Sequence, residues 1–233
     1  MTTLIIDSSA GCATAVLADG PNVLSAYSVR GSTLSILHHA IHAVHLDYGG
    51  SLSQLERIAV VQGPGSWTGL HNCVTTAKTI AQVLEIPLIP LSMLEALATS
   101  FDYFEGTVCA MLDAKHGAVY SAAYDCAAGA IVGQSLADRK RTIDELLEGL
   151  AGSIGPMLLV GGSATLHVAE LSKRLSRALT ASEVDYPHPA AFARLAAKRT
   201  SAGLIGDALF GLAPDYMQED FTAKPRKDVE CSS

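Results

Sequence analysis

Two aspartates each end a predicted strand and enter a turn that carries polar side chains. Asp7 is followed by Ser8 and Ser9, and Asp113 is followed two residues later by Lys115. Carboxylates, hydroxyls and a lysine at such turns could receive a phosphate or a nucleotide. The same side chains could instead accept hydrogen bonds from the amides of their own turns. The residues alone leave both interpretations open.

A glycine-rich loop joins the predicted strand 58–61 to the predicted helix 68–84. Its glycine and hydroxyl positions are Gly63, Gly65, Ser66, Thr68 and Gly69. Glycines let a backbone approach another group closely, and amides at a helix N-terminus can receive an anion. The loop lacks the Gly-Lys-Ser/Thr of a Walker loop and the spacing of a dinucleotide fingerprint. It joins the two aspartate turns as a candidate phosphate or nucleotide site, but does not establish one.

Three histidines form a stripe on the predicted helix 33–48. His38, His42 and His45 stand at i, i+4 and i+7. Imidazoles at this spacing could chelate Zn²⁺, but one exposed helix lacks the remaining ligand and supporting groups of a dedicated site. We therefore predict no metal site and an interface or solvated face. In a contact surface, these imidazoles should weaken association below about pH 6.5.

Composition excludes several other functions. The chain has 233 residues, is 49% hydrophobic, carries a net charge of −7 and has five cysteines without a CxxC pair. No basic leader or long apolar run is present, so we expect a cytoplasmic protein with reduced thiols and no membrane association. Because of this negative charge, we do not expect the protein to bind nucleic acid without a partner. Ser66 does not lie in a G-x-S-x-G motif, so no serine nucleophile is assigned.

The predicted elements repeat the order βββαβαβα. The first set has strands at 4–7, 13–18, 23–29, 58–61 and 88–91, with helices at 33–48 and 68–84 and from 94. The second has strands at 108–112, 119–124, 131–136, 158–160 and near 184, with helices starting at 143, at 166–179 and at 190–204. Ser53/Glu56, Ser92/Glu95 and Thr142/Glu145 have capping-box spacing. The repetition predicts two α/β lobes, at 1–105 and 106–217, with a final helix able to return to the first lobe. A polar tail without fixed structure follows at 218–233.

Several segments together resemble the TsaB family of bacterial tRNA threonylcarbamoyladenosine biosynthesis proteins. The loop Gly63–Leu70 is similar to the family's G-P-G-S-F-T-G-L, and residues 86–97 to its I-P-hydrophobic-S-x-L-E-A-L segment. Residues 112–120 resemble L-D-A-R-x-G-x-V-Y, and 213–217 the terminal P-x-Y-L-R. The family's arginine after G-L is His71 here. The resemblance implies two ribonuclease-H-like lobes of the actin-like, sugar-kinase and Hsp70-like superfamily, with a glycoprotease-like family history.

The resemblance also implies a role without catalysis. The related catalytic subunit TsaD carries an H-x-x-x-H metal pair where this chain has Met93 and Leu97. A thioether and an alkyl group do not replace imidazoles at such a site. The family implies binding and activation of TsaD, association with the ATPase TsaE and homodimerisation in the absence of a partner. Contact with tRNA would be through the complex only. No cofactor of its own is implied, while ATP or ADP could bind at the complex interface.

Two helices of the first lobe carry the expected partner surface. Each helix carries more apolar surface than packing against its own sheet would bury. Burial against that sheet is the default explanation for one apolar stripe on each helix. The candidate interface residues are Leu34, Leu37, His38, Ile41, His42, Val44, His45, Leu70, His71, Val74, Ala77 and Lys78. Two alternatives stay open: an ATPase or phosphotransferase that uses Asp7 and Asp113 between the lobes, and a homodimeric nucleotide-binding module.

Overall fold

The computed structural model describes residues 1–31, 33–49, 51–175, 179–199 and 203–217. The predicted tail 218–233 lies outside these residues. No helix of the described ranges is long and apolar enough to cross a bilayer.

The first sheet contains five strands in the order β3-β2-β1-β4-β5. The strands are β1 (Thr2–Asp7), β2 (Cys12–Asp19), β3 (Asn22–Arg30), β4 (Arg57–Gly63) and β5 (Leu88–Ser92). β1 is antiparallel to β2 and parallel to β4, so the sheet is mixed. Alternate side chains face opposite sides of it: Ile6 and Val60 lie in the outer core, and Ile5 and Ala59 in the core between the lobes.

The second sheet repeats this topology, in the order β10-β9-β6-β7-β8. The strands are β6 (Gly106–Asp113), β7 (Ala118–Ala127), β8 (Ala130–Thr142), β9 (Met157–Val160) and β10 (Leu179–Ala181). β8 extends well beyond the predicted range 131–136, because β7 pairs with it, through bulges, as far as Thr142. The two similar sheets confirm the predicted two-lobed α/β class.

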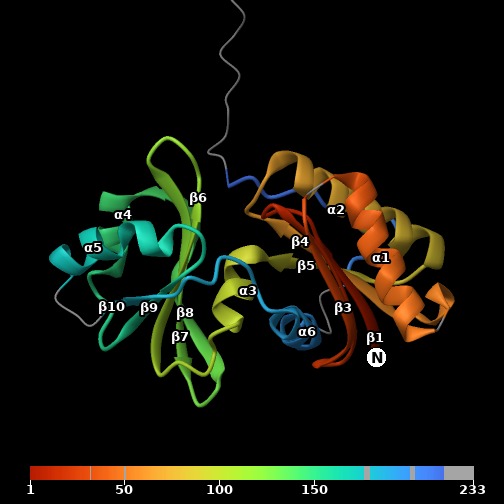
Figure 1. Cartoon of the computed structure of the whole chain (residues 1–233), viewed down its shortest axis with the longest axis horizontal. Coiled ribbons are helices and arrows are strands. Elements are labelled where there is room, and N and C mark those ends of the chain that lie inside the picture. Colours follow the sequence, from red (N-terminus) through yellow and green to blue (C-terminus); the bar gives the residue numbers. More distant parts are fainter. Residues whose placement is uncertain (32, 50, 176–178, 200–202, 218–233) are drawn as a thin grey trace, which may run out of the picture.

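Helices and sheets alternate in five layers (Figure 1). The helices are α1 (Leu34–Tyr48), α2 (Trp67–Leu84), α3 (Met93–Thr99), α4 (Ile143–Leu150), α5 (Ala164–Arg174), α6 (Pro189–Lys198) and α7 (Ala208–Gly211), with a 3-10 turn at Leu52–Gln54. α1 and α2 cover the outer face of the first sheet, and α4 and α5 the outer face of the second. α3 and α6 lie between the sheets, and their apolar side chains share one core with the inner faces of both.

The hydroxyl side chains of Thr33, Ser66, Ser92 and Thr142 cap the N-termini of α1, α2, α3 and α4. The Thr142 hydroxyl and the Glu145 carboxylate form a complete capping box at α4. Ser92 accepts a hydrogen bond from the Glu95 amide, but the Glu95 carboxylate pairs with Arg199 instead of completing the box.

Four features predicted from the sequence differ in the structure. No helix begins at Ser53, and the Glu56 carboxylate accepts a hydrogen bond from the Thr2 amide instead. The helix predicted at 166–179 ends at Arg174, and the strand predicted near 184 is β10. The helix predicted at 190–204 ends at Lys198, while Leu204 pairs with Leu88 at the edge of the first sheet. Short apolar runs such as these do not distinguish a helix end from a strand.

Candidate functional site

The glycine-rich loop packs tightly against the turn that follows β1. The Ser66 amide donates to the Ser9 carbonyl at 2.7 Å, and the Ser8 hydroxyl donates to the Gly69 carbonyl at 2.7 Å. A Cβ added at Gly69 would lie 1.9 Å from the Ser8 carbonyl oxygen. Contact within the chain therefore requires glycine there. Of the predicted phosphate-site residues, those at 7–9 and 63–69 come together in the first lobe.

Asp7 is buried at the centre of this cluster. Its Oδ1 accepts a hydrogen bond from the Ser9 amide at 2.9 Å, and its Oδ2 accepts one from the Tyr186 hydroxyl at 2.6 Å. Burial raises the pKa of the Asp7 carboxyl, against the lowering effect of these hydrogen bonds. The side chain is 1% exposed. Both carboxylate oxygens therefore have partners within the chain, and the residue is closed to solvent.

Asp113 has the opposite environment at the corresponding turn of the second lobe. Its Oδ1 accepts from the Lys115 amide at 2.7 Å, and its Oδ2 pairs with the Lys115 ammonium at 2.6 Å. The side chain is exposed, and these hydrogen bonds hold the pKa of Asp113 below its ordinary value. Asp7 and Asp113 thus each accept a hydrogen bond from the amide two residues later, which is the turn-capping interpretation.

The C-terminal motif lies against the same loop, a contact that the sequence analysis did not predict. The Asp215 amide donates to the Gln62 carbonyl at 2.8 Å, and a Cβ at Gly63 would lie 2.1 Å from the Asp215 carbonyl oxygen. The Tyr216 hydroxyl lies 2.5 Å from Nδ1 of His71. The His71 ring stacks on the Trp67 ring, with 4.2 Å between the ring centroids. The two motifs are 145 residues apart along the chain, so no local pattern indicates their contact.

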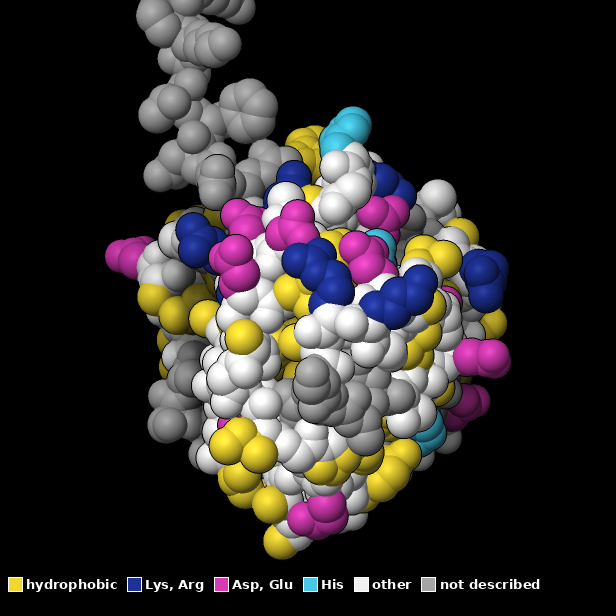
Figure 2. Space-filling model, turned by 90° about the vertical axis from the view of Figure 1, so that its left-hand side faces the viewer, with side chains coloured by type: hydrophobic (Ala, Val, Ile, Leu, Met, Phe, Trp, Pro, Cys, Tyr) yellow, Lys and Arg dark blue, Asp and Glu magenta, His cyan; other side chains and the backbone are white. Residues whose placement is uncertain are grey.

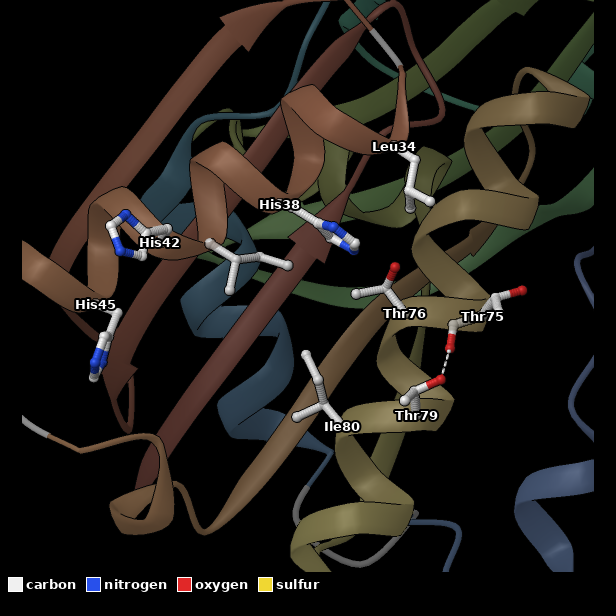
Figure 3. Close-up of a pocket in the computed structure, with 9 residues that line it drawn as sticks. Leu34, His38, His42, His45, Thr75, Thr76, Thr79 and Ile80 are labelled. Atoms are coloured by element: carbon white, nitrogen blue, oxygen red, sulfur yellow. Dashed lines mark hydrogen bonds between the residues drawn. The ribbon is translucent and has the colours of Figure 1, made fainter.

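A groove lies between α1 and α2 on the outer face of the first lobe (Figure 3). Its volume is 460 Å³, and it is lined by Leu34, His38, Ile41, His42, His45, Thr75, Thr76, Thr79 and Ile80. His38 points toward α2, while His42 and His45 follow along α1. The Thr79 hydroxyl donates to the Thr75 carbonyl at 3.0 Å, so it is satisfied within its own helix. The exposed surface of the groove is largely apolar.

The predicted interface residues divide into two groups. Leu34, His38, Ile41, His42 and His45 line the groove. Leu37, Val44, Leu70, Val74 and Ala77 are buried in the first lobe itself. They occupy the stripes that face the sheet, so a charge placed there would unfold the lobe. His71 stacks with Trp67, and the Lys78 ammonium donates to the Phe210 carbonyl at 3.3 Å.

The side chains of His38, His42 and His45 do not gather around a common position at which a metal ion could bind. In the part of the chain that the structure describes, no group of three or more His, Cys, Asp or Glu side chains is placed to hold a metal ion. Met93 and Leu97 are fully buried in the core between the sheets.

The fold and these motifs define a two-lobed α/β protein related to the threonylcarbamoyltransferases. Residues 33–153 match the family model of TsaD, tRNA N6-adenosine threonylcarbamoyltransferase. The chain is 31% identical to the tRNA threonylcarbamoyladenosine biosynthesis protein TsaB of Bacillus subtilis over 77% of this chain and 76% of that protein. It is 32% identical to TsaB of Haemophilus influenzae over 52% of each. The chain belongs to the TsaB family.

Solved structures show the same fold. A Pseudomonas aeruginosa protein described as similar to the peptidase YeaZ superposes with a TM-score of 0.74 at 20% identity, over 93% of this chain and 99% of that one. YeaZ from the same organism gives a TM-score of 0.70 at 22% identity, over 91% and 98%.

Proposed function

We propose that this protein is a non-catalytic subunit of the complex that forms N6-threonylcarbamoyladenosine in tRNA, and that it binds and activates TsaD. The observation that carries the proposal is the apolar groove between α1 and α2. Both helices already bury one stripe against their own sheet, through residues such as Leu37 and Val74. Leu34 is nonetheless 46% exposed at the groove. The groove therefore exposes apolar surface that the core of the lobe does not bury, and such a surface favours binding of a protein partner.

The small side chains of α2 suit a helical partner. Thr75, Thr76 and Thr79 line one wall of the groove. Short side chains allow a neighbouring helix to approach closely and pack ridges into grooves. The proposed contact is therefore made by helices of TsaD, or by the same helices of a second copy when TsaD is absent.

The environment of Asp7 supports a role without catalysis. A general base or a phosphate-binding carboxylate must reach its substrate. Here both oxygens of Asp7 accept hydrogen bonds inside the chain, Oδ1 from the Ser9 amide and Oδ2 from the Tyr186 hydroxyl. Met93 and Leu97, which by resemblance stand at the metal-pair positions of TsaD, are buried apolar side chains. Both observations count against the alternative of an ATPase or phosphotransferase.

Other components would join through the complex. On the outer face of the second lobe, the basic side chains that the structure describes lie among acidic ones (Figure 2). On that face, Arg174 of α5 pairs with Asp144 of α4 at 2.5 Å. Because RNA binding needs clustered cations, tRNA would be held by TsaD, with ATP or ADP and TsaE at surfaces that the complex completes.

The test measures binding of the TsaD protein of the same organism and threonylcarbamoyl transfer to tRNA. Leu34→Glu should weaken binding more than about 100-fold, because it buries an unpaired charge. Leu166→Glu is the matched control, since Leu166 is 75% exposed on α5 of the second lobe. Transfer should be lost when the protein is omitted. Undiminished transfer without it, or equal binding by the two variants, would contradict the proposal.

A further inference from the structure

A second hollow lies between the lobes, separate from the groove of α1 and α2. It has a volume of 520 Å³ and is bounded by the carboxyl end of β5, the start of α3 and the strands β7 and β8. A smaller cavity of 110 Å³ shares Ser92, Asp138 and Arg199 with it and reaches Gly63 at the end of β4. The two hollows together form the interlobe groove, defined by these shared residues.

The interlobe groove lies where two parallel strands of the first sheet end. Gly63 and Ser92 are the last residues of β4 and β5, they pair with each other, and both line the smaller cavity. Ligands of open α/β sheets bind outside the carboxyl ends of such strands. In the larger hollow, Ile131 and Val132 add an apolar wall beside polar side chains, and Val132 is 66% exposed. This position and this mixed lining are typical of a small-molecule site.

Asp138 brings an uncompensated negative charge to the interlobe groove. Its Oδ2 accepts a hydrogen bond from the Ser92 hydroxyl at 2.5 Å, and its Oδ1 accepts from the Tyr124 hydroxyl at 2.8 Å and from Nε2 of Gln134 at 2.7 Å. All three donors are neutral, and Asp138 forms no ion pair with any residue that the structure describes. A carboxylate offers about four acceptor positions, so Oδ2 can accept one further hydrogen bond.

The other charges of the interlobe groove leave a second carboxylate without a cation. Arg199 pairs with Glu95, and these two charges cancel. Asp215 lines the smaller cavity, where its Oδ1 accepts a hydrogen bond from the Met217 amide at 2.9 Å. Among the described residues, no cation pairs with Asp215. The interlobe groove therefore favours an occupant with two positive charges, one for Asp138 and one for Asp215.

The lining favours an organic dication over a metal ion. In the described part of the chain, no three His, Cys, Asp or Glu side chains are placed to hold a metal. Pro90, Leu91 and Met217 line the smaller cavity beside the two carboxylates. These side chains offer contact to methylene groups and no oxygen ligand to a hard cation.

We propose that the interlobe groove binds an aliphatic diamine, with one ammonium group at Asp138 and the other at Asp215. The methylene stem would lie against Pro90 and Met217 in the smaller cavity. A cavity of 110 Å³ admits such a stem but not a folded segment of a protein, so the occupant is a free small molecule. This site lies apart from the partner groove of α1 and α2 and does not depend on binding of TsaD.

Calorimetric titration of the full chain with 1,4-diaminobutane tests the site. The native chain should bind this diamine at least about tenfold more tightly than D138N or D215N, because each variant removes the charged partner of one ammonium. Asp215 is exposed, so D215N should keep the fold even if D138N weakens it. The control is D125N, since Asp125 lines neither hollow, and it should bind like the native chain. Equal affinity in all four proteins would overturn the proposal.

Other probes and amide resonances test the two-point contact. The singly charged 1-aminobutane should bind the native chain about tenfold more weakly than 1,4-diaminobutane. The diamine should shift the amide resonances of Ser92, Gln134 and Met217, which lie along the interlobe groove. Equal binding of the monoamine, tighter binding of Mg²⁺, or shifts confined to the groove of α1 and α2 would each overturn the proposal.

Discussion

The Tyr186 hydroxyl donates a 2.6 Å hydrogen bond to the buried carboxylate of Asp7, and so joins the segment before α6 to the carboxyl end of β1. This bond crosses 179 residues of sequence. It fixes the chain that returns from the second lobe onto the first sheet.

Removal of this donor should destabilise the fold. Tyr186→Phe leaves Oδ2 of Asp7 buried without its partner, which should lower the free energy of unfolding by about 1–3 kcal/mol. Denaturant unfolding measures the change. Tyr103→Phe is the control, because Tyr103 is 68% exposed. A loss no greater than the control's would show that the bond contributes nothing.

Asp7 should also make stability depend on pH. Its pKa in the folded state is raised above the ordinary 3.8, so the folded protein holds the proton more tightly than the unfolded chain. Stability from this group is complete below 3.8 and decreases as pH rises through the folded-state pKa. Asp7→Asn should therefore flatten the decrease of unfolding free energy with rising pH. Parallel curves for the two proteins would contradict this assignment.

Asp113 should show the opposite sign. Its folded-state pKa is lowered, so its contribution is present above 3.8 and is lost as pH falls through the folded-state pKa. Because the pair with Lys115 is exposed, Asp113→Asn should have only a small effect. Unfolding curves between pH 2 and pH 5, compared with those of Asp7→Asn, separate the two aspartates.

The contact between Gly69 and Ser8 leaves no room for a side chain. Gly69→Ala places a methyl group 1.9 Å from a carbonyl oxygen and should cost about 3 kcal/mol of stability. Gly152→Ala is the control, since nothing lies within 4 Å of a Cβ there. Thermal unfolding of both variants measures the difference, and similar midpoints would show that the loop can relax.

Binding of TsaD should weaken in acid if the proposed interface is correct. His38, His42 and His45 line the groove, and protonated imidazoles would place like charges in an apolar contact. The variant H38Q/H42Q/H45Q should bind equally at pH 8 and pH 5.5. Equal binding of TsaD by the native protein at pH 8 and pH 5.5 would contradict this prediction.

The elements predicted for the first lobe agree closely with the observed ones, and those predicted for the second lobe agree less well. Predicted strands and helices up to Leu97 begin within a few residues of the observed ones, because caps such as Ser66 and the buried strand runs give independent signals. Leu179 was predicted at the end of a helix and lies instead in β10. A short apolar segment takes its form from the sheet edge beside it, which a local pattern does not contain.

The candidate site was predictable only in part. Periodicity found apolar stripes on both helices but did not separate Leu37, which faces the sheet, from Leu34, which faces the groove. Thr75 and Thr79 were missed because threonine carries no apolar signal. The contact of Tyr216 with His71 depends on long-range packing and had no signal along the chain.

The helices α3 and α6 pack against the inner faces of both sheets and share one hydrophobic core with them. Neither half of the chain therefore possesses a complete hydrophobic interior, although the order of strands and helices is duplicated. The two halves should melt in one cooperative transition. A gene fragment that encodes either half would yield a chain with one sheet face bare, and such a chain would aggregate instead of forming a free-standing lobe.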